Sequence, residues 1–456
     1  MRAPTRMLLG RQKGLFEKAA EFEKTQYYPE SELIAYQEEK LRRLIQHAYS
    51  TTPFYKELFD KKGLRPSDIK KIGDLKKLPV INKEDIRGSY AKMLSASCGE
   101  RIFQRKTGGS TGVPLIIANN YRSGIAEQAL YLRFLKWIGY EYGECSILLW
   151  GEHPGGPLIK RMKKRVVSRI LNETYFNTYN LGDEMYYKMT SAIRKNPPRL
   201  LRGYASAIHA LALKFLEGGT GIRLNSVTVT AEKFFSFQRR KVEEAFGENV
   251  FDQYGCGETN SIAFECTAHA GLHVASEHVI VELLDGQQAD AAHGDIVITN
   301  LDNYAMPIIR YRNGDQAKWA NLYCPCGRNL PLLEEIEGRI YDLIEGPDGR
   351  KIHAGFCDDV FLDLDLGRKY GLREFRIVQE NLDRLRLEFA AGDNLSEKDV
   401  NAVRSKFCQF LGDVKIEIAY VDAIPLTGRG KKMFVLSLLN RRHLTGGPNG
   451  NAHLPR

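Results

Sequence analysis

The 456-residue sequence has no long hydrophobic run. It contains no stretch of about 18 uninterrupted apolar residues, the length that a membrane-spanning helix needs. Near the N-terminus, basic residues flank only a three-residue apolar patch, Met7 to Leu9. That patch is too short for the core of a signal peptide. These absences argue against a transmembrane segment and a secretory signal, and we expect a cytoplasmic protein.

Cysteine is also scarce, and the basic clusters lack aromatic neighbours. Eight cysteines in a chain of this length are too few for a disulfide scaffold, and a cytosolic setting keeps them reduced. The net charge is +10, but clusters such as residues 160–165 (KRMKKR) lack the interleaved aromatic side chains of a platform for single-stranded nucleic acid. We therefore expect no nucleic-acid partner. No internal repeat is visible either.

What is present is an alternation of short apolar runs with amphipathic stretches. Residues 15–75 show helical spacing of apolar positions, punctuated by Pro53 and Pro66. From about residue 110 to 335 the alternation favours an α/β fold. The expected strands there are Ser146–Leu149, Val227–Thr230, His278–Leu284 and Asp295–Thr299, and the expected helix is Phe237–Phe246.

The pattern changes near Gly338, and the chain is long enough for a second core. Residues 338–353 (GRIYDLIEGPDGRKIH) predict a strand, a tight turn and another strand. Beyond them the expected elements of a small α+β domain are strands at 374–379, 384–389 and 415–421 and a helix at 397–411. The predicted domains are thus 1–337, a large N-terminal domain, and 338–440, a small mobile one. Residues 441–456 are polar, rich in Gly and Pro, and expected to be disordered.

Two segments in the larger domain suggest nucleotide chemistry. Residues 106–114 (KTGGSTGVP) combine glycines and hydroxyls in a loop suited to phosphate oxygens. The loop is not a Walker motif, because Val113 and Pro114 follow Gly112, and a flexible connection is the competing interpretation. Residues 253–259 (QYGCGET) place an aromatic ring that can stack on a base near Glu258, a hard ligand for Mg²⁺.

Three further segments add to this interpretation. In residues 307–315 (PIIRYRNGD), Asp315 in a turn can accept hydrogen bonds from a ribose diol, although an Asn-Gly turn between two strands is the commoner meaning of that dipeptide. Residues 337–342 (EGRIYD) lie at the predicted domain boundary. Residues 425–432 (PLTGRGKK) place lysines after glycines, where one can reach a phosphate or simply lie in an exposed turn.

In order and spacing, these five segments resemble the adenylate-forming superfamily of acyl-CoA synthetases, within the phenylacetate-CoA ligase-like branch that includes CapK-type proteins. The resemblance covers nearly the whole chain, and residues 51–87 resemble the entry region of that branch. It implies a large N-terminal adenylate-forming domain with mixed sheets and helices, followed by a small C-terminal α+β domain on a hinge.

The resemblance also implies roles for individual residues. Around the ATP phosphates it places Thr107, Gly108, Gly109, Ser110, Thr111 and Gly112, with Leu115 where a basic residue often ends the loop. At the adenosine and Mg²⁺ it places Ala231, Glu232, Tyr254, Gly255, Glu258 and Asp315, with Arg312 in the ribose motif and Thr259 as a substitute for the hydroxyl that Gly257 replaces. Arg339 and Asp342 fall at the hinge, and Lys431, or adjacent Lys432, is the lysine that contacts the reacting carboxylate.

The implied function is activation of a carboxylic acid by ATP and Mg²⁺ as an acyl-AMP, with pyrophosphate release and acyl transfer to CoA. One alternative is an adenylating ligase that forms an amide or ester in capsule, polysaccharide or natural-product biosynthesis. Another is a non-catalytic, zinc-stabilised binding protein. The expected partners are ATP, a small carboxylic acid, and CoA or an amine or hydroxyl acceptor; an oligomer is compatible with the sequence. Residues 150–153, 203–206 and 230–235 should line the acid pocket, where aromatics suggest an apolar or aromatic acid.

Four residues form a candidate metal set. Cys266 with His269 and Cys324 with Cys326 make a C-x2-H pair and a C-x-C pair, the right number of ligands for tetrahedral Zn²⁺. His273 is the reserve fourth ligand. Because adenylation works through Mg²⁺, this Zn²⁺ would be structural. The competing interpretation is a set of unrelated buried thiols and a surface histidine.

Overall fold

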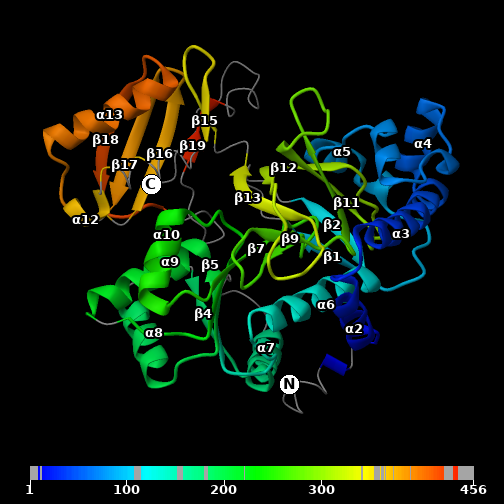
Figure 1. The fold of residues 1–456 in the computed structure, drawn as a ribbon, viewed down its shortest axis with the longest axis horizontal. Coiled ribbons are helices and arrows are strands. Elements are labelled where there is room, and N and C mark those ends of the chain that lie inside the picture. Colours follow the sequence, from blue (N-terminus) through cyan, green and yellow to red (C-terminus); the bar gives the residue numbers. More distant parts are fainter. Residues whose placement is uncertain are drawn as a thin grey trace. The chain divides into compact units, whose positions relative to one another are not determined.

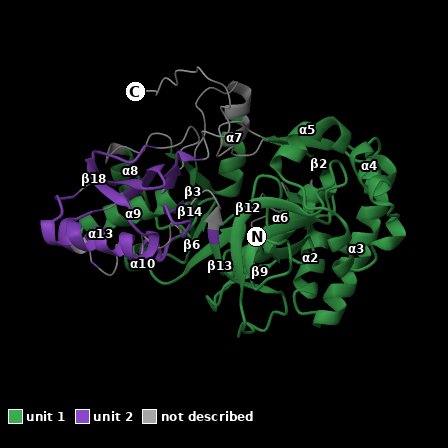
Figure 2. Cartoon of the chain, turned by 90° about the horizontal axis from the view of Figure 1, so that it is seen from above, with its two compact units in different colours: residues 1–234, 241–336 green, residues 235–240, 337–456 purple. Residues whose placement is uncertain are grey.

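The computed structural model describes most of the chain: residues 9–10, 13–106, 115–150, 158–178, 183–219, 221–339, 343–353, 360, 364, 366–372, 374–390, 392–425 and 435–439. It divides into two compact units, shown in separate colours in Figure 2. The first comprises residues 1–234 and 241–336, and the second comprises residues 235–240 and 337–456. The α/β fold class is confirmed.

The first unit begins with helices, as the apolar spacing predicts. They are α2 (Leu15–Thr25), α3 (Glu30–Thr51), α4 (Pro53–Lys62), the 3₁₀ turns η1 (Pro66–Asp68) and η2 (Ile72–Lys77), and α5 (Lys83–Met93). Pro53 occupies the first turn of α4, where its missing N–H costs nothing, and Gly63 at φ 67° ends that helix. The hairpin of β1 (Ile102–Lys106) and β2 (Ile116–Asn120) follows.

An eleven-stranded sheet forms the body of this unit (Figure 1). Its spatial order is β10-β11-β12-β13-β9-β8-β7-β6-β5-β3-β4. Strands β3 to β7 run parallel. On the other side of β7, the pairs β7–β8, β8–β9, β9–β13, β10–β11 and β11–β12 are antiparallel. The bounds are β3 (Ser146–Trp150), β4 (Glu173–Asn177), β5 (Leu200–Tyr204), β6 (Ser226–Thr230), β7 (Val250–Tyr254), β8 (Ala263–Glu265), β9 (Leu272–Val274), β10 (Val279–Leu284), β11 (His293–Asn300), β12 (Tyr311–Trp319) and β13 (Leu332–Arg339).

Helices pack on both faces of the parallel strands, which is why those strands are apolar almost throughout. One face carries α6 (Tyr121–Trp137), which shares a buried core with Leu200 and Phe251. The other face carries α8 (Asp183–Lys195), α9 (Ala205–Glu217) and part of α10 (Ser236–Phe246), around a core that includes Leu149, Val229 and Val250. Helix α7 (Leu158–Leu171) precedes β4.

A buried ion pair joins α6 to the segment before β10. Arg133 and Glu277 have side chains that are 0% exposed, and Arg133 Nη1 lies 2.5 Å from Glu277 Oε1. Thr25 Oγ1, at the end of α2, donates to the same carboxylate oxygen at 2.7 Å. Lys40 Nζ donates to the Glu277 backbone carbonyl at 2.6 Å. The pair therefore holds the N-terminal helices against the sheet. Because both charged groups are buried, each depends on the other to compensate for its lost hydration.

The second unit has its own sheet and core. Strands β14 (Leu343–Glu345) and β15 (Lys351–His353) pair antiparallel across the Gly-Pro-Asp-Gly turn. A four-stranded sheet has the order β18-β17-β16-β19. Its elements are β16 (Glu374–Asn381), β17 (Arg384–Ala390), α13 (Glu397–Leu411), β18 (Lys415–Val421) and β19 (Val435–Ser437), with α12 (Leu366–Tyr370) before them. Ser396 caps α13 by accepting from Asp399 N–H.

Within the described ranges, no helix is both long enough and apolar enough to cross a bilayer.

Candidate functional site

The candidate nucleotide site lies at the carboxyl ends of the parallel strands, where open α/β sheets bind ligands. Strand β6 ends at Thr230, and the next residue, Ala231, has φ 69°. A non-glycine residue in this left-handed region is strained by about 1 kcal/mol or more, and such strain gathers at functional sites. Strand β7 ends beside it at Tyr254, which is followed by Gly255. A side chain at Gly255 would approach Ser261 N to 3.1 Å, so the turn after β7 needs glycine for space.

Tyr254 is tied to the predicted ribose ligand. Its hydroxyl donates to Asp315 Oδ2 at 2.7 Å, and Asn313 Nδ2 donates both to the Tyr254 oxygen at 2.6 Å and to Asp315 Oδ2 at 3.1 Å. Burial first, and then the Asp315 carboxylate, raise the pKa of Tyr254 well above its ordinary value. The phenol therefore remains a hydrogen-bond donor. Residues predicted for the adenine and for the ribose thus share one hydrogen-bonded network, although 61 positions separate them.

Asp315 lies in a strand, so the expectation that it lies in a turn is wrong, and so is the competing interpretation of Asn313-Gly314 as a turn between two strands. Both residues belong to β12. Between Asp295–Gln316 and Val297–Arg312 the pairing of β11 with β12 shifts register, and Gly314 has φ 90°. The irregularity is a bulge, which explains how an Asn-Gly pair can lie inside a strand. A bulge re-aims side chains, and here it leaves the Asp315 carboxylate facing the end of β7.

Glu258 lies in the turn after β7 and is 6% exposed. The turn closes where Cys256 N–H donates to the Thr259 carbonyl at 3.0 Å. Tyr311 Oη, on β12, donates to Glu258 Oε1 at 3.1 Å. The Glu258 carboxylate is therefore fixed between the end of β7 and β12, the two strands that carry Tyr254 and Asp315. Thr259 is fully buried, and its hydroxyl accepts from Asn300 Nδ2 at 3.4 Å.

Glu232 has a structural contact of its own. Its Oε2 accepts from Ser206 N–H at 2.8 Å, in the first turn of α9. An anionic side chain at a helix N-terminus satisfies an otherwise orphan N–H and complements the helix dipole. Glu232 therefore anchors the segment after β6 to the end of β5. Arg312, the other residue of the predicted ribose motif, pairs with Asp295 at 3.3 Å.

Several predicted site residues lie outside the described residues. They are Asp342, Lys431, Lys432 and the whole phosphate loop, Thr107, Gly108, Gly109, Ser110, Thr111 and Gly112. For Arg339, the last residue of β13, the backbone alone is described. The described part of the site is therefore its adenosine and Mg²⁺ side.

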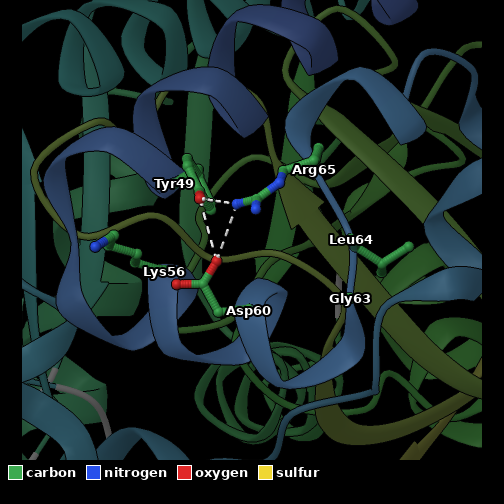
Figure 3. Close-up of a pocket in the computed structure, with 6 residues that line it drawn as sticks. All are labelled: Tyr49, Lys56, Asp60, Gly63, Leu64 and Arg65. Atoms are coloured by element: carbon green, nitrogen blue, oxygen red, sulfur yellow. Dashed lines mark hydrogen bonds and ion pairs between the residues drawn. The ribbon is translucent and has the colours of Figure 1, made fainter.

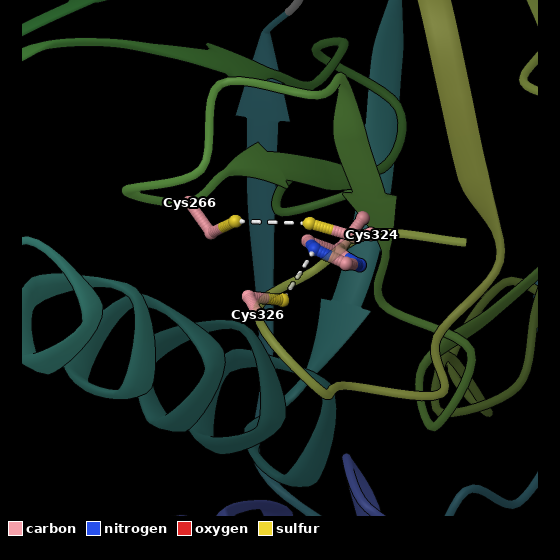
Figure 4. Close-up of side chains that lie close together, drawn as sticks. Cys266, Cys324 and Cys326 are labelled. Atoms are coloured by element: carbon pink, nitrogen blue, oxygen red, sulfur yellow. Dashed lines mark hydrogen bonds between the residues drawn. The ribbon is translucent and has the colours of Figure 1, made fainter. Parts of the chain in front are cut away.

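A second constellation forms a candidate metal centre at strands β8 and β9 and the loop before β13. Ligand atoms of Cys266, His273, Cys324 and Cys326 all lie within 4.8 Å of one another. The Sγ atoms of Cys266 and Cys324 are 3.5 Å apart, and Cys326 Sγ lies 3.3 Å from His273 Nε2. Figure 4 shows the three cysteines converging. Three thiols and one imidazole form a set of the Cys₃His type, which suits a tetrahedral metal.

The fourth member of this set is His273, and the expectation of His269 is corrected. Antiparallel pairing of β9 with β8 and β13 sets His273 opposite Phe264 and Leu332. His269 instead turns away: its Nδ1 lies 2.8 Å from Glu265 Oε1, and its ring stacks on Phe251. The C-x2-H spacing was misleading because His269 at φ 51° lies in the turn between the strands. Strand pairing, which brings residue 273 back beside residue 266, was the missing information.

The surroundings of the cluster suit metal binding. His273 Nδ1 is 3.4 Å from the Leu330 carbonyl, which leaves Nε2 directed at the cysteines. Burial lowers the pKa of His273 to about 4, so its imidazole is neutral, which is the form that binds a metal. Arg328 lies over the Trp137 ring at 4.3 Å, and Arg328 Nε and Trp137 Nε1 both donate to Gln26 Oε1 at 2.9 Å. The loop carrying Cys324 and Cys326 is thereby fastened to α2 and α6.

A surface pocket elsewhere in the first unit is a weaker candidate (Figure 3). There Arg65 Nη1 donates to Tyr49 Oη at 2.7 Å and lies 3.3 Å from Asp60 Oδ1, so the arginine and the carboxylate neutralise each other. The lining residues are Tyr49, Lys56, Asp60, Gly63, Leu64 and Arg65, on α3, α4 and the segment after them. None belongs to the predicted nucleotide or metal sets.

Comparison with solved structures identifies the fold. A 2-hydroxyisobutyryl-CoA ligase in the postadenylation state, in complex with R3-HIB-AMP, superposes with a TM-score of 0.72 at 20% identity, over 92% of this chain and 93% of that one. An open conformation of the same ligase, in complex with 2-HIB-AMP and CoA, superposes with a TM-score of 0.61 at 21% identity, over 90% and 93% of the two chains. The chain therefore shares the fold of this ligase.

Sequence comparison finds a matching domain family and several relatives. Residues 344–437 match the family of the CapK C-terminal domain. Phenylacetate-coenzyme A ligase of Thermus thermophilus is 25% identical over 327 residues, 69% of this chain and 72% of the relative. Protein CapK of Staphylococcus aureus is 22% identical over 424 residues, 89% and 90% of the two chains. The small second unit thus matches the CapK C-terminal domain, and the chain is similar to a phenylacetate-coenzyme A ligase over 69% of its length and to CapK over 89%.

Proposed function

We propose that this chain activates a small carboxylic acid with ATP, forming an acyl-AMP and pyrophosphate, and then transfers the acyl group to CoA. The observation that carries the proposal is the network of Tyr254, Asn313 and Asp315, fixed beside buried Glu258 at the carboxyl ends of the strands. Similarity to a 2-hydroxyisobutyryl-CoA ligase over 92% of this chain and to a phenylacetate-coenzyme A ligase over 69% of it supports the proposal.

In this proposal the described residues hold the nucleotide. The Tyr254 ring lies against adenine, the Asp315 carboxylate accepts from the ribose diol, and the strained Ala231 presents the end of β6 to the base. Glu258 holds Mg²⁺, because a buried carboxylate supplies the hard oxygen that this ion prefers. The ion would neutralise phosphate charge. Tyr311 keeps Glu258 oriented through its hydrogen bond.

The chemical step is attack by the substrate carboxylate oxygen on the α-phosphorus. A phosphorus–oxygen bond to the acid forms as the bond to the pyrophosphate breaks, and pyrophosphate leaves with both electrons of that bond. Two anions must meet, so positive charge and in-line positioning are needed. We assign that role to Lys431 and to the loop from Thr107 to Gly112. Arg339 and Asp342 are the proposed hinge by which the small domain withdraws the lysine before the second nucleophile arrives.

A second candidate function differs only in the acceptor. The match to the CapK C-terminal domain and the similarity to CapK over most of both chains favour an amine or hydroxyl acceptor, as in capsule, polysaccharide or natural-product assembly. The deciding experiment measures pyrophosphate release from ATP with a panel of carboxylic acids, and then product formation with CoA, with amines and with sugars. Thioester formation supports the first proposal, and amide or ester formation supports the second. Absence of pyrophosphate release with every acid would leave only a non-catalytic binding role.

We further propose that the Cys₃His cluster holds one structural Zn²⁺. The donor set and the neutral imidazole fit that ion, and the cluster contains none of the residues assigned to the nucleotide. Metal analysis of the purified protein should find one zinc per chain. Full zinc content in Cys324→Ser with Cys326→Ser would contradict the assignment.

A further inference from the structure

Arg202 lies on central strand β5 without a carboxylate partner. Its guanidinium carbon is 4.5 Å from the centre of the Tyr131 ring on α6, so the side chain points to the α6 face of the sheet. Among the residues that the structure describes, no carboxylate reaches it within ion-pair distance, and its Nε is buried without a hydrogen-bond partner. Arg202 is half-buried, and its side chain also hydrogen-bonds to the Tyr131 side chain. An anionic group that reached the guanidinium would form a charge-assisted pair with its remaining donors.

Neighbouring strands add polar groups on the same face. Thr228 on β6 lies opposite Arg202, is 1% exposed, and has a hydroxyl with no partner among the described residues. Gln253, next to Tyr254 on β7, likewise has a buried Oε1 that no described residue contacts. Each such group costs about 1–3 kcal/mol if nothing satisfies it. Arg202 and Thr228 are paired in register, and Gln253 lies two residues nearer the strand ends, opposite Thr230. These groups on three adjacent strands indicate a polar site that extends from the strand ends towards Arg202.

The location matches the expected path of the acid. The reacting carboxylate should lie at the carboxyl ends of these strands, beside the nucleotide residues. Arg202 is two residues before Tyr204, the last residue of β5, so it lies about 7 Å deeper along the sheet. Trp150 and Tyr204, whose ring centres are 4.4 Å apart with the rings tilted by 36°, lie at the ends of their strands. An acid whose reacting carboxylate lies at the strand ends and that extends along the α6 face would bring its far end to Arg202.

We propose that Arg202 binds a second anionic group of the carboxylic acid substrate, with Thr228 and Gln253 as hydrogen-bonding partners, so that the enzyme prefers a dicarboxylic acid. This inference rests on the proposed adenylation and revises the expectation of a purely apolar acid. It makes Arg202 a specificity-determining residue. Tyr131 supports it by holding the guanidinium through its ring.

The test compares pyrophosphate release for matched pairs of acids, such as glutarate and adipate against pentanoate and hexanoate, and isophthalate against benzoate. We expect the wild type to prefer the dicarboxylic member in at least one pair. Arg202→Met should lower kcat/KM for that acid about 10- to 100-fold, the effect of one charge-assisted pair, and should leave or raise kcat/KM for its monocarboxylic partner. Arg202→Lys should retain part of the preference, since it keeps the charge.

Arg194→Met is the matched control, because Arg194 also lies over an aromatic ring, that of Phe215, but on α8 at the opposite face of the sheet. It should not alter the preference. A wild type that favours the monocarboxylic acid in every pair would overturn the inference and leave adenylation standing. Equal losses for both acids in folded Arg202→Met and Arg202→Lys would also overturn it. No pyrophosphate release with any acid would count against adenylation itself.

Discussion

Replacing Asp315 with Ala should weaken ATP binding without altering the dependence on Mg²⁺. The carboxylate would lose the ribose diol, a charge-assisted interaction of roughly 1.5–3 kcal/mol. That corresponds to a rise in Kd of about 10- to 150-fold. Tyr254 Oη would keep its contact with Asn313 Nδ2 at 2.6 Å, so the adenine side should stay ordered. Calorimetric titration with ATP at saturating and limiting Mg²⁺ measures both quantities.

The hydrogen bond between Tyr254 and Asp315 makes the prediction sharper. Tyr254→Phe keeps the ring but removes the donor that orients Asp315 at 2.7 Å, and should cost about 0.5–1.5 kcal/mol of ATP binding. In an Asp315→Ala background the same change should cost almost nothing, because the acceptor is gone. The double-mutant cycle should therefore show a coupling of about 0.5 kcal/mol or more.

Two variants separate the nucleotide role from a general effect. Asp295→Ala removes a carboxylate from the same bulge, where Asp295 contacts Gln316 and Arg312, and it should leave ATP affinity unchanged. Glu258→Gln should raise the Mg²⁺ requirement and slow acyl-AMP formation while adenosine binding persists. Folded Asp315→Ala and Glu258→Gln proteins with wild-type behaviour towards ATP and Mg²⁺ would refute the reasoning, and so would strict additivity of Tyr254→Phe with Asp315→Ala.

Three other outcomes follow from the same structure. Lys431→Ala should nearly abolish acyl-AMP formation but spare acyl transfer from pre-made acyl-AMP; equal losses in both half-reactions, measured separately, would reject its role. His273→Ala should lose zinc, as measured by metal analysis, whereas His269→Ala should retain it, and the reverse result would restore the C-x2-H set. Arg133→Met should lower the free energy of unfolding by about 3–5 kcal/mol, because it leaves the buried Glu277 carboxylate uncompensated. Denaturant titration should find the Arg133→Met/Glu277→Leu double variant more stable than the single one, and a double variant that is less stable would contradict this.

The local sequence pattern predicted helices and strands well, but it predicted contacts between distant residues poorly. Strand β18 and helix α13 have the predicted bounds, since alternation and a Ser cap are local signals. The bulge at Gly314 and the choice of His273 depend on which strands pair, and pairing is set by the whole sheet. Arg202 gave no sequence signal at all. From sequence alone, an arginine in a strand is predicted to be exposed to solvent. Only the structure shows that a helix covers that face of the sheet.

Cys266 and Cys324 are 58 positions apart, and the chain between them forms β9 to β12, including Asp315. A metal held by both would close this segment into a loop. Fixing the ends of a loop that long removes unfolded-state entropy worth about 4 kcal/mol, by analogy with a disulfide of the same span. The metal would then stabilise the antiparallel half of the sheet by linking the two ends of this segment. Removal of the metal by a chelator should therefore make this segment the first part of the chain to be cleaved by a protease. Affinity for ATP should also fall, because the segment contains Asp315, although no metal ligand belongs to the proposed nucleotide site.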